Sequence, residues 1–150
     1  MQVSELDLNS LKKICFFLKN KNVQVLYFAD SLGALNLKKF KKIVQILKKH
    51  WTKELGLHAH DNLRQALKNS VYAINNNFRW IDSTIMGMGR GPGNLKTEEI
   101  LKTVQRKQVS IINNLKNKYF IKLKKKYKWG TNKYYREAAI KKIHPTYIQF

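Results

Sequence analysis

The sequence predicts an α/β fold in which parallel strands alternate with helices, and three observations support this prediction. Three short runs rich in apolar and β-branched residues occupy 23–31, 54–60 and 79–87. A segment with helical spacing of its apolar residues follows each run. Strand and helix together repeat at intervals of roughly 25 to 30 residues, which is the length of a βαβ unit. Strands joined by crossover helices run parallel, so a parallel sheet is expected.

The first helix is expected at residues 4–19, ahead of the first strand. Its apolar residues recur every three or four positions, and Glu5 and Asp7 stand at its start, where negative charge favours a helix N-terminus. The next run, VQVLYFADS at 23–31, is almost continuously apolar and ends in polar residues. This pattern is typical of a parallel strand that is buried on both faces.

The middle of the chain repeats the same alternation. Apolar residues and lysine pairs on opposite faces predict a helix at 37–50. The run ELGLHAH predicts a strand at 54–60, and a helix is expected at 62–77. A third strand is expected at 79–87, and it leads into the glycine-rich segment GMGRGPGN at 87–94. Three strands make either a small open sheet or part of a larger α/β structure.

The C-terminal third differs in composition from the rest of the chain. Residues 97–118 again have helical spacing, and the segment after them mixes lysines with aromatic residues around a turn at Gly130. We therefore expect the α/β domain at 1–104 and a helical C-terminal extension at 105–150.

The net charge of +21 first suggests a polyanionic partner, because cationic surfaces gain affinity by releasing the counterions of nucleic acids. However, 25 of the 30 basic residues are lysines, whereas bidentate recognition of bases and phosphates favours arginine. The many asparagines and isoleucines are typical of an AT-rich coding sequence. We therefore place composition bias ahead of nucleic-acid binding, and keep a non-catalytic basic binding module as the alternative.

Cysteine content and hydropathy indicate the cellular setting. Cys15 is the only cysteine, so an intrachain disulfide or a thiolate metal cluster is excluded. No apolar run approaches the roughly 20 residues of a membrane span, and no secretion signal is present. These features predict a cytoplasmic protein without a membrane partner.

The motif HAHDN at 58–62 is the strongest candidate for a functional site. Side chains two positions apart in a strand share a face, so His58 and His60 can bind one divalent cation. Without a nearby cysteine, oxygen ligands would complete the shell, which favours Mn²⁺ or Mg²⁺ over structural zinc. Two histidines alone are more often ordinary core or surface residues. Polar residues also follow the neighbouring strands, in ADS and DST, at the ends where α/β sheets bind ligands.

The run GLHAHDNLRQALKNSVYAINNNFRWIDSTIMGMGRGPGNLKTEEIL at 56–101 resembles the HMG-CoA-lyase-like (DRE-TIM metallolyase) superfamily of metal-dependent TIM barrels, most closely its 4-hydroxy-2-oxovalerate aldolase type. The shared elements are an H-x-H-(D/H)-N strand, a helix with A-x-x-N-S, a D-(A/S)-(S/T) strand and a G-x-G-x-(G/A)-x-G-N loop. YFADSLGAL at 27–35 and the tail at 128–149 also resemble members of this group. The resemblance implies the C-terminal half of a TIM barrel, strands six to eight, followed by a small helical extension.

The resemblance also implies roles for individual residues. His58 and His60 would bind a divalent metal, Mn²⁺ first and Mg²⁺ as the alternative, with Asn94 at the same site. The expected substrate-side residues are Asp30, Asp61, Gly89 and Gly91. A tyrosine of the extension, Tyr135 or its neighbour Tyr134, would act as a catalytic proton donor. His50 and His144 lie outside these motifs, and we expect them to be structural or surface histidines.

The implied reaction is carbon–carbon bond cleavage or formation at a 4-hydroxy-2-oxo acid, in which the metal stabilises a pyruvate enolate. The R-D-G motif of the family's first strand is absent from these 150 residues. We therefore expect a C-terminal fragment that is inactive without an N-terminal barrel half, or that forms a homo-oligomer. An aldehyde dehydrogenase is a further expected partner. An acyl-CoA enzyme resembling HMG-CoA lyase or isopropylmalate synthase is the alternative, although HAHDN and a glycine loop without cysteine favour the aldolases.

Overall fold

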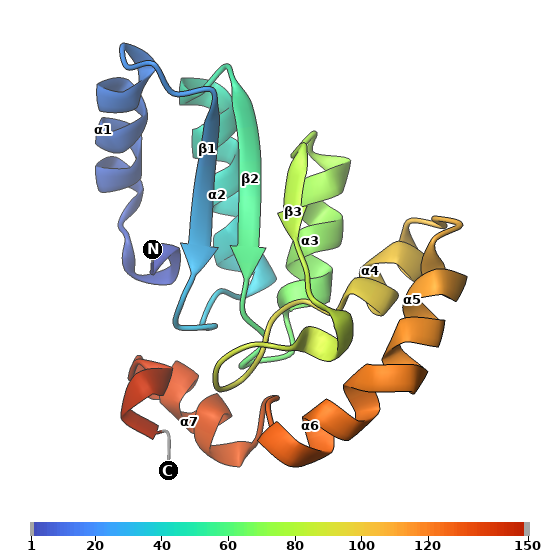
Figure 1. Cartoon of the computed structure of the whole chain (residues 1–150). Helices are drawn as coiled ribbons and strands as arrows, with labels where there is room; N and C mark the ends of the chain where they lie inside the picture. The colour runs from blue at the N-terminus through green and yellow to red at the C-terminus, as the bar shows by residue number, and fades with distance from the viewer. Residues whose placement is uncertain (1, 149–150) are drawn as a thin grey trace.

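The computed structural model describes residues 2–148 and contains one parallel sheet in the order β1-β2-β3 (Figure 1). The strands are β1 (Val25–Asp30), β2 (Glu54–Ala59) and β3 (Trp80–Asp82). β1 pairs with β2 along its whole length, whereas β3 pairs only with Gly56–His58. Sequential parallel strands joined by helices are the arrangement of a TIM barrel, so the predicted fold class is confirmed.

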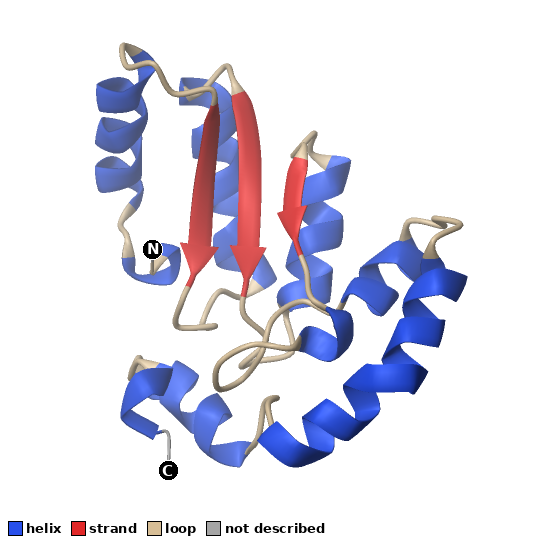
Figure 2. Cartoon of the chain, in the orientation of Figure 1, coloured by secondary structure: helices blue, strands red, loops and turns tan. Residues whose placement is uncertain are grey.

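Two helices, α2 (Leu37–His50) and α3 (Ala66–Asn75), cover one face of the sheet (Figure 2). α1 (Leu8–Lys19) packs beside α2 at the β1 edge. The core between the sheet and these helices is apolar and contains aromatic pairs between Phe28, Phe40 and Phe78. Burial of this apolar face is the main force that holds the helices on the sheet.

Side chains cap the first two helices. Asp7 accepts hydrogen bonds from the backbone N–H groups of Asn9 and Ser10, both at 2.9 Å. Asn36 accepts one from Lys39 at the start of α2, also at 2.9 Å. These bonds satisfy N–H groups that have no partner within the helix. Helix α1 therefore begins at Leu8, four residues later than the helix predicted from residue 4.

The second face of the sheet is left uncovered by α2 and α3. Tyr27, Gly56 and Trp80 are partners in register, as are Ala29, His58 and Asp82 two residues further along the strands. Because side chains alternate along a strand, these residues point away from the core residues Phe28, Leu55 and Leu57. Tyr27 is 41% exposed and Trp80 49%. In a closed barrel this face lines the interior.

The C-terminal part forms a series of short helices that pass beneath the carboxyl ends of the strands (Figure 1). Their bounds are α4 (Thr97–Thr103), α5 (Val109–Leu115), the π-helical η3 (Lys116–Phe120), α6 (Ile121–Tyr127), α7 (Lys133–Lys141) and the 3₁₀ turn η4 (Pro145–Ile148). Two further 3₁₀ turns are η1 (Val3–Glu5) and η2 (Ile85–Gly87). The boundary proposed between residues 104 and 105 falls just after α4 and stays a prediction.

The single helix predicted at 97–118 was wrong, because the chain turns after Thr103. Gln105 adopts a left-handed conformation with φ 54°, its N–H bonds the carbonyl of Lys102, and Arg106 N bonds Leu101 O at 2.9 Å. This pair of bonds forms a Schellman motif, which ends α4. Glycine usually occupies the left-handed position, so the glutamine gave no sequence signal.

The third strand and the helix before it are also shorter than predicted. β3 ends at Asp82, because Thr84 leaves the strand direction and its N–H bonds Leu95 O at 3.0 Å, and residues 85–87 form a 3₁₀ turn. Helix α3 begins at Ala66 rather than at residue 62, after a loop in which Arg64 has φ 54°. Both loops lie at the carboxyl end of the sheet.

Within residues 2–148, every helix falls short of the length and apolar character that crossing a membrane requires.

Candidate functional site

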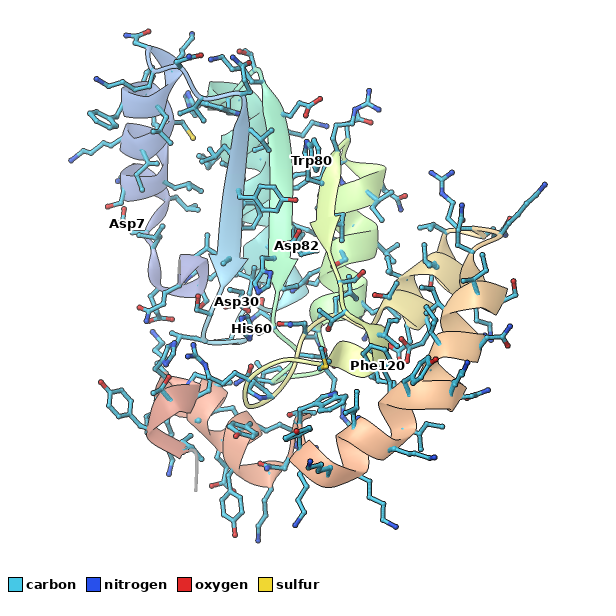
Figure 3. The ribbon with its side chains drawn as sticks, viewed as in Figure 1. Asp7, Asp30, His60, Trp80, Asp82 and Phe120 are labelled. Carbon is cyan, nitrogen blue, oxygen red and sulfur yellow. The ribbon has the colours of Figure 1, made fainter. Side chains whose placement is uncertain are left out.

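The candidate site lies where β1, β2 and β3 end. Asp30 and Asp82 close their strands, and His60 directly follows β2 (Figure 3). A bridge between the main chains of His60 and Asn94 brings the glycine-rich loop to the same edge. Parallel strands present their carboxyl ends together, so side chains distant in sequence meet here.

His58 and His60 are neighbours, as the strand periodicity predicted. Their ring centroids are 5.0 Å apart and their ring planes are inclined by 71°. His58 is partly exposed at the end of β2, and His60 is half-buried. Two imidazoles at this separation can converge on one cation from the same side of the strand.

The orientation of the His58 ring is determined by Asp82. The Nδ1 atom of His58 lies 3.0 Å from Oδ2 of Asp82, and a carboxylate can only accept this bond. Nδ1 therefore carries the proton, and the lone pair of Nε2 is free for a metal. A carboxylate that orients a histidine in this way is typical of metal-binding sites.

Tyr27 extends this arrangement to a third strand. Its hydroxyl donates to Oδ1 of Asp82 at 3.1 Å, and burial together with this bond raises the pKa of Tyr27 to about 12. The sequence reasoning did not identify Tyr27 as a site residue. What marks Tyr27 is the strand register, which places its ring on Gly56. An added Cβ at Gly56 would lie 2.5 Å from the ring.

His60 has a different environment. Its Nδ1 atom is buried without a hydrogen-bond partner in the described part of the chain. Burial lowers the pKa of His60 to about 4, and repulsion from the neighbouring basic groups His58, His144 and Arg90 acts in the same direction. The ring is therefore neutral at neutral pH, as metal binding requires. An unpartnered buried imidazole nitrogen fits a metal ligand.

Both histidines line a cavity of about 510 Å³. Its other lining residues are Gln2, Ala29, Ser31, Arg90, Pro92, His144 and Pro145. Arg90 comes from the glycine-rich loop, and its guanidinium is suited to binding a carboxylate. The expectation that His144 is remote from the cluster was wrong, because the extension folds back beneath the strand ends and carries His144 to this cavity.

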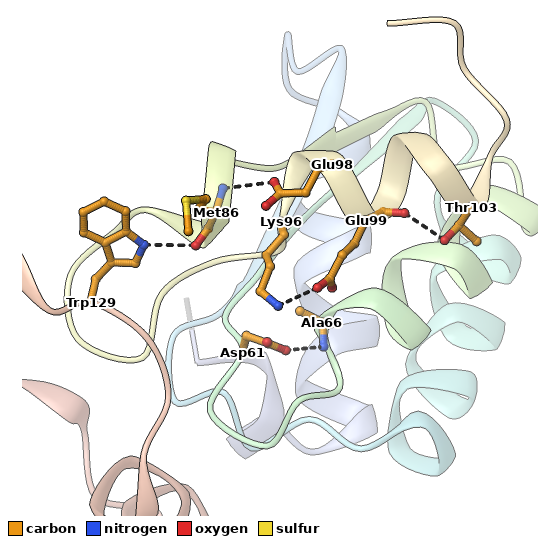
Figure 4. A network of polar contacts seen from close by, with 8 residues as sticks. All are labelled: Asp61, Ala66, Met86, Lys96, Glu98, Glu99, Thr103 and Trp129. Atoms are coloured by element: carbon orange, nitrogen blue, oxygen red, sulfur yellow. Dashed lines mark hydrogen bonds and ion pairs between the residues drawn. The ribbon is translucent and has the colours of Figure 1, made fainter. Parts of the chain in front are cut away.

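Asn94 and Asp61 line a second, adjacent cavity of about 630 Å³. The side-chain amide of Asn94 donates to the carbonyl of Met88 at 3.1 Å, so only its main chain meets His60 directly. Asp61 accepts from Ala66 N at 3.1 Å at the start of α3 (Figure 4), and burial raises the pKa of its carboxyl group. Neither Asn94 nor Asp61 lines the histidine cavity.

Asp30 is buried, with an exposed fraction of 3%. Its Oδ2 accepts from Leu35 N at 2.8 Å, and Asn69 donates to the carbonyl of Leu35 at the same distance. Burial raises the pKa of the Asp30 carboxyl group. In this structure Asp30 holds the loop after β1 and does not line the histidine cavity.

The glycine-rich loop contacts Tyr135 rather than its neighbour Tyr134, and the catalytic role expected of Tyr135 stays a prediction. Gly91 has φ 64°, and an added Cβ would lie 3.3 Å from the Tyr135 ring, so this ring packs on the loop. Gly89 similarly lies against the side chain of Asn94. Tyr134, in contrast, is 56% exposed. The aromatic side chain that meets the loop is therefore Tyr135.

Four hydrogen bonds fasten the extension to the loops at the strand ends. Trp129 Nε1 donates to Met86 O at 3.0 Å (Figure 4), and Gly130 N donates to Gly91 O at 3.0 Å. The fully buried Asn62 makes the other two: its carbonyl accepts from Thr131 Oγ1 at 2.7 Å, and its Nδ2 donates to Tyr135 O at 3.4 Å. The sequence reasoning placed Asn62 in the HAHDN motif but did not predict this linking role.

Among residues 2–148, no three His, Cys, Asp or Glu side chains are already grouped to hold a metal ion. The oriented His58 and the unpartnered His60 supply two nitrogen ligands, and the remaining positions would need water, substrate or further protein oxygens.

Comparison with known proteins supports this description. A model of the HMGL-like family matches residues 1–125. The chain is 35% identical over 89 residues to the 4-hydroxy-2-oxovalerate aldolase of Brevibacillus brevis and 29% identical over 89 residues to the oxaloacetate decarboxylase of Mycobacterium tuberculosis. In both cases the match covers 59% of this chain and 26% of the relative, so the chain spans a small part of these relatives' length.

Solved structures give the same result. The N-terminal domain of a protein described as an aldolase from Bacteroides vulgatus superposes with a TM-score of 0.81 at 32% identity, covering 97% of this chain and 49% of that one. The HMG-CoA lyase of Bacillus subtilis has the same fold, with a TM-score of 0.71 at 18% identity and half of its chain covered. Its motifs, its fold and these matches show that the chain belongs to the HMGL-like family, and the proteins it resembles are aldolases and lyases.

Proposed function

We propose that this chain is the metal-binding segment of a divalent-metal-dependent aldolase that acts on a 4-hydroxy-2-oxo acid. The observation that carries the proposal is the pair of histidines at the end of β2, one oriented by Asp82 and the other buried, neutral and unpartnered. A site prepared in this way favours a cation and leaves positions open for a ligand.

His58 and His60 would hold the metal, with Mn²⁺ as the first candidate and Mg²⁺ as the alternative. When bound, the metal supplies Lewis-acid stabilisation of negative charge on the oxygens of the substrate. Arg90 lines the same cavity and would bind the substrate carboxylate. Tyr135 is retained as the proposed proton donor, because its ring packs on the loop that carries Arg90.

The names of the relatives favour a 2-oxo acid substrate. The Brevibacillus brevis relative is named for 4-hydroxy-2-oxovalerate and the Mycobacterium tuberculosis relative for oxaloacetate, and both compounds are 2-oxo acids. A 2-oxo acid offers adjacent carboxylate and keto oxygens that can chelate one metal. An acyl-CoA substrate stays the alternative within the family.

The proposed partner is a complementary barrel half, or a second copy of the chain, on the uncovered face of the sheet. Tyr27 and Trp80 are exposed there, and the chain covers about half of the similar Bacteroides vulgatus structure. Aromatic residues on an open sheet face favour burial against another surface. An aldehyde dehydrogenase that receives the product and a cytoplasmic location stay predictions.

The test is to measure Mn²⁺ binding to the 150-residue chain by electron paramagnetic resonance. We expect the wild-type chain to bind Mn²⁺, and the double variant His58→Ala/His60→Ala to lose at least tenfold in affinity. His50→Ala is the matched control, because His50 stacks on Phe16 at the end of α2, away from the cavity. Equal Mn²⁺ affinity in the double variant and the wild type would disprove the metal site.

Aldolase activity is a separate measurement, made on the chain co-expressed with an N-terminal barrel half. Pyruvate release from 4-hydroxy-2-oxovalerate should require both halves and Mn²⁺. Release that persists in the His58→Ala/His60→Ala variant would contradict the proposal.

A further inference from the structure

We infer that His144 is a substrate-binding residue of the histidine cavity, where its Nε2–H donates a hydrogen bond to an oxygen of the bound 2-oxo acid. This inference deepens the proposed function and rests on it. It starts from the position of His144, which the C-terminal extension brings to the cavity already lined by His58, His60 and Arg90.

The tautomer of His144 follows from the hydrogen bond at its Nδ1 atom. The backbone N–H of Thr146 lies 3.3 Å from Nδ1 of His144, and a backbone N–H can only donate. Nδ1 is therefore the acceptor, and the proton of the neutral ring is on Nε2. His144 thus presents a hydrogen-bond donor, whereas the neighbouring His58 presents a lone pair because Asp82 holds its proton on Nδ1.

These opposite tautomers give the two histidines different chemistry in one cavity. A ring with a free lone pair on Nε2 can bind a cation, and a ring with a proton on Nε2 can bind an anionic oxygen. Arg90 provides a second donor group for such a ligand. The cavity therefore combines a metal side with a donor side, which matches a 2-oxo acid that has a chelating end and further oxygens.

His144 also has a defined place in the fold. Helix α7 ends at Lys141, and Lys142 turns the chain with φ 58°. Its ammonium group forms an ion pair with Glu5 at 2.9 Å, which joins this turn to η1. On the other side of His144, Pro145 is buried. The backbone is thus held on both sides of His144, and the bond from Thr146 N holds the ring, so little conformational entropy is lost when a ligand binds.

The experiment measures oxalate binding by titration calorimetry in the Mn²⁺-loaded 150-residue chain, because oxalate is a planar analogue of the enolate of a 2-oxo acid. We expect His144→Ala to weaken oxalate binding about tenfold, the loss of one hydrogen bond to a charged ligand, with unchanged Mn²⁺ affinity. His144→Gln, whose amide nitrogen can replace Nε2–H, should retain affinity within about threefold of wild type. His50→Ala is the control and should match wild type in both titrations.

Three results would overturn the inference. If His144→Ala binds oxalate with wild-type affinity, His144 makes no contact with the substrate, and the metal site and the proposed function stay intact. A parallel loss of Mn²⁺ affinity in His144→Ala would make this residue a metal ligand instead. Absence of Mn²⁺ binding to the wild-type chain would contradict the proposed function itself. Failure of the proposed function and failure of the inference about His144 are therefore distinguishable.

A tautomer measurement keeps the inference testable without any ligand. Long-range ¹H–¹⁵N correlation spectra of the metal-free chain should show His144 protonated on Nε2 and His58 protonated on Nδ1. An Nδ1–H tautomer at His144 would rule out the proposed donor. Circular dichroism and thermal unfolding of His144→Ala, compared with His50→Ala, show whether each variant is folded.

Discussion

The Nδ1 atom of His58 lies 3.0 Å from Oδ2 of Asp82, whose other oxygen accepts a hydrogen bond from Tyr27. Three strands thus contribute one side chain each to a single hydrogen-bonded chain. Its effect is to keep the proton of His58 on Nδ1 and the lone pair on Nε2. A metal at this site should therefore depend on residues that do not touch it.

The first prediction concerns this chain of hydrogen bonds. Asp82→Asn replaces the acceptor with an amide that can also donate, so the tautomer of His58 is no longer selected. We expect Mn²⁺ affinity to fall by about 10- to 100-fold, measured by calorimetry. Tyr27→Phe, which removes only the outer hydroxyl, should have a smaller effect. An Asp82→Asn variant that binds Mn²⁺ as wild type does would refute the orienting role.

The second prediction concerns pH. The folded-state pKa of His60 is depressed to about 4 from its ordinary value of 6.5. Between pH 4 and 6.5 the unfolded chain binds more protons than the folded chain. The contribution of neutral His60 to the free energy of unfolding is therefore complete above pH 6.5 and is lost as the pH falls towards 4. Its size is on the order of 2 kcal/mol after allowance for the partial exposure of His60.

Urea unfolding of the metal-free chain at several pH values measures this effect. In His60→Gln the ionisable group is absent, so the free energy of unfolding should fall less between pH 6.5 and 4 than in the wild type. The Thr103→Val variant, which removes no ionisable group, should retain the wild-type slope. Identical slopes in His60→Gln and the wild type would contradict the depressed pKa.

The third prediction concerns the glycine-rich loop. Gly91 has φ 64° and lies against the Tyr135 ring. Gly91→Ala should lower the free energy of unfolding by roughly 1–2 kcal/mol, because side chains disfavour the left-handed conformation, and by more if the ring is also displaced. Repeating the substitution in a Tyr135→Ala background isolates the backbone cost. A Gly91→Ala chain as stable as wild type would show that the loop adopts another conformation.

The fourth prediction concerns the attachment of the extension. Asn62 is fully buried and bonds both Thr131 and Tyr135. Asn62→Ala removes the side-chain bond to Tyr135 O and should cost about 1–3 kcal/mol. Thr131→Val removes the bond to Asn62 O, with a smaller cost. In both variants hydrogen exchange should accelerate at residues 129–148.

Thr103→Val is the control for this experiment, because Thr103 bonds the carbonyl of Glu99 within α4, outside the segment 129–148. It should leave exchange at 129–148 unchanged. If Asn62→Ala shows the same exchange pattern as Thr103→Val, the extension is held mainly by its apolar contacts, such as the buried Trp129 and Ala138.

Much of the fold could be predicted from periodicity. The apolar runs placed β1 and β2 correctly, and the amphipathic spacing placed α2 at 37–50. Periodicity failed where a single residue takes an unusual conformation, as at Gln105 and Arg64, both with φ 54°. Neither residue type favours this conformation, and the surrounding hydrogen bonds stabilise it.

The candidate site was predicted only in part. The spacing of His58 and His60 in one strand was enough to predict that they share a face. Asn94 lines a different cavity, although its main chain pairs with His60. Asp30 holds a loop instead of lining the histidine cavity. Which way a side chain points from a loop depends on packing that local sequence does not encode.

By itself, the sequence determined the alternating strands and helices, the pair of histidines and the family motifs, because these are properties of neighbouring residues and of period. Only the tertiary structure decided that Tyr27, Asp82 and His58 form one chain of hydrogen bonds and that His144 reaches the same cavity. The physical reason is that strand register and the docking of the extension arise from contacts between residues far apart in sequence. Those contacts place side chains to within the few ångströms on which hydrogen bonding and metal binding depend.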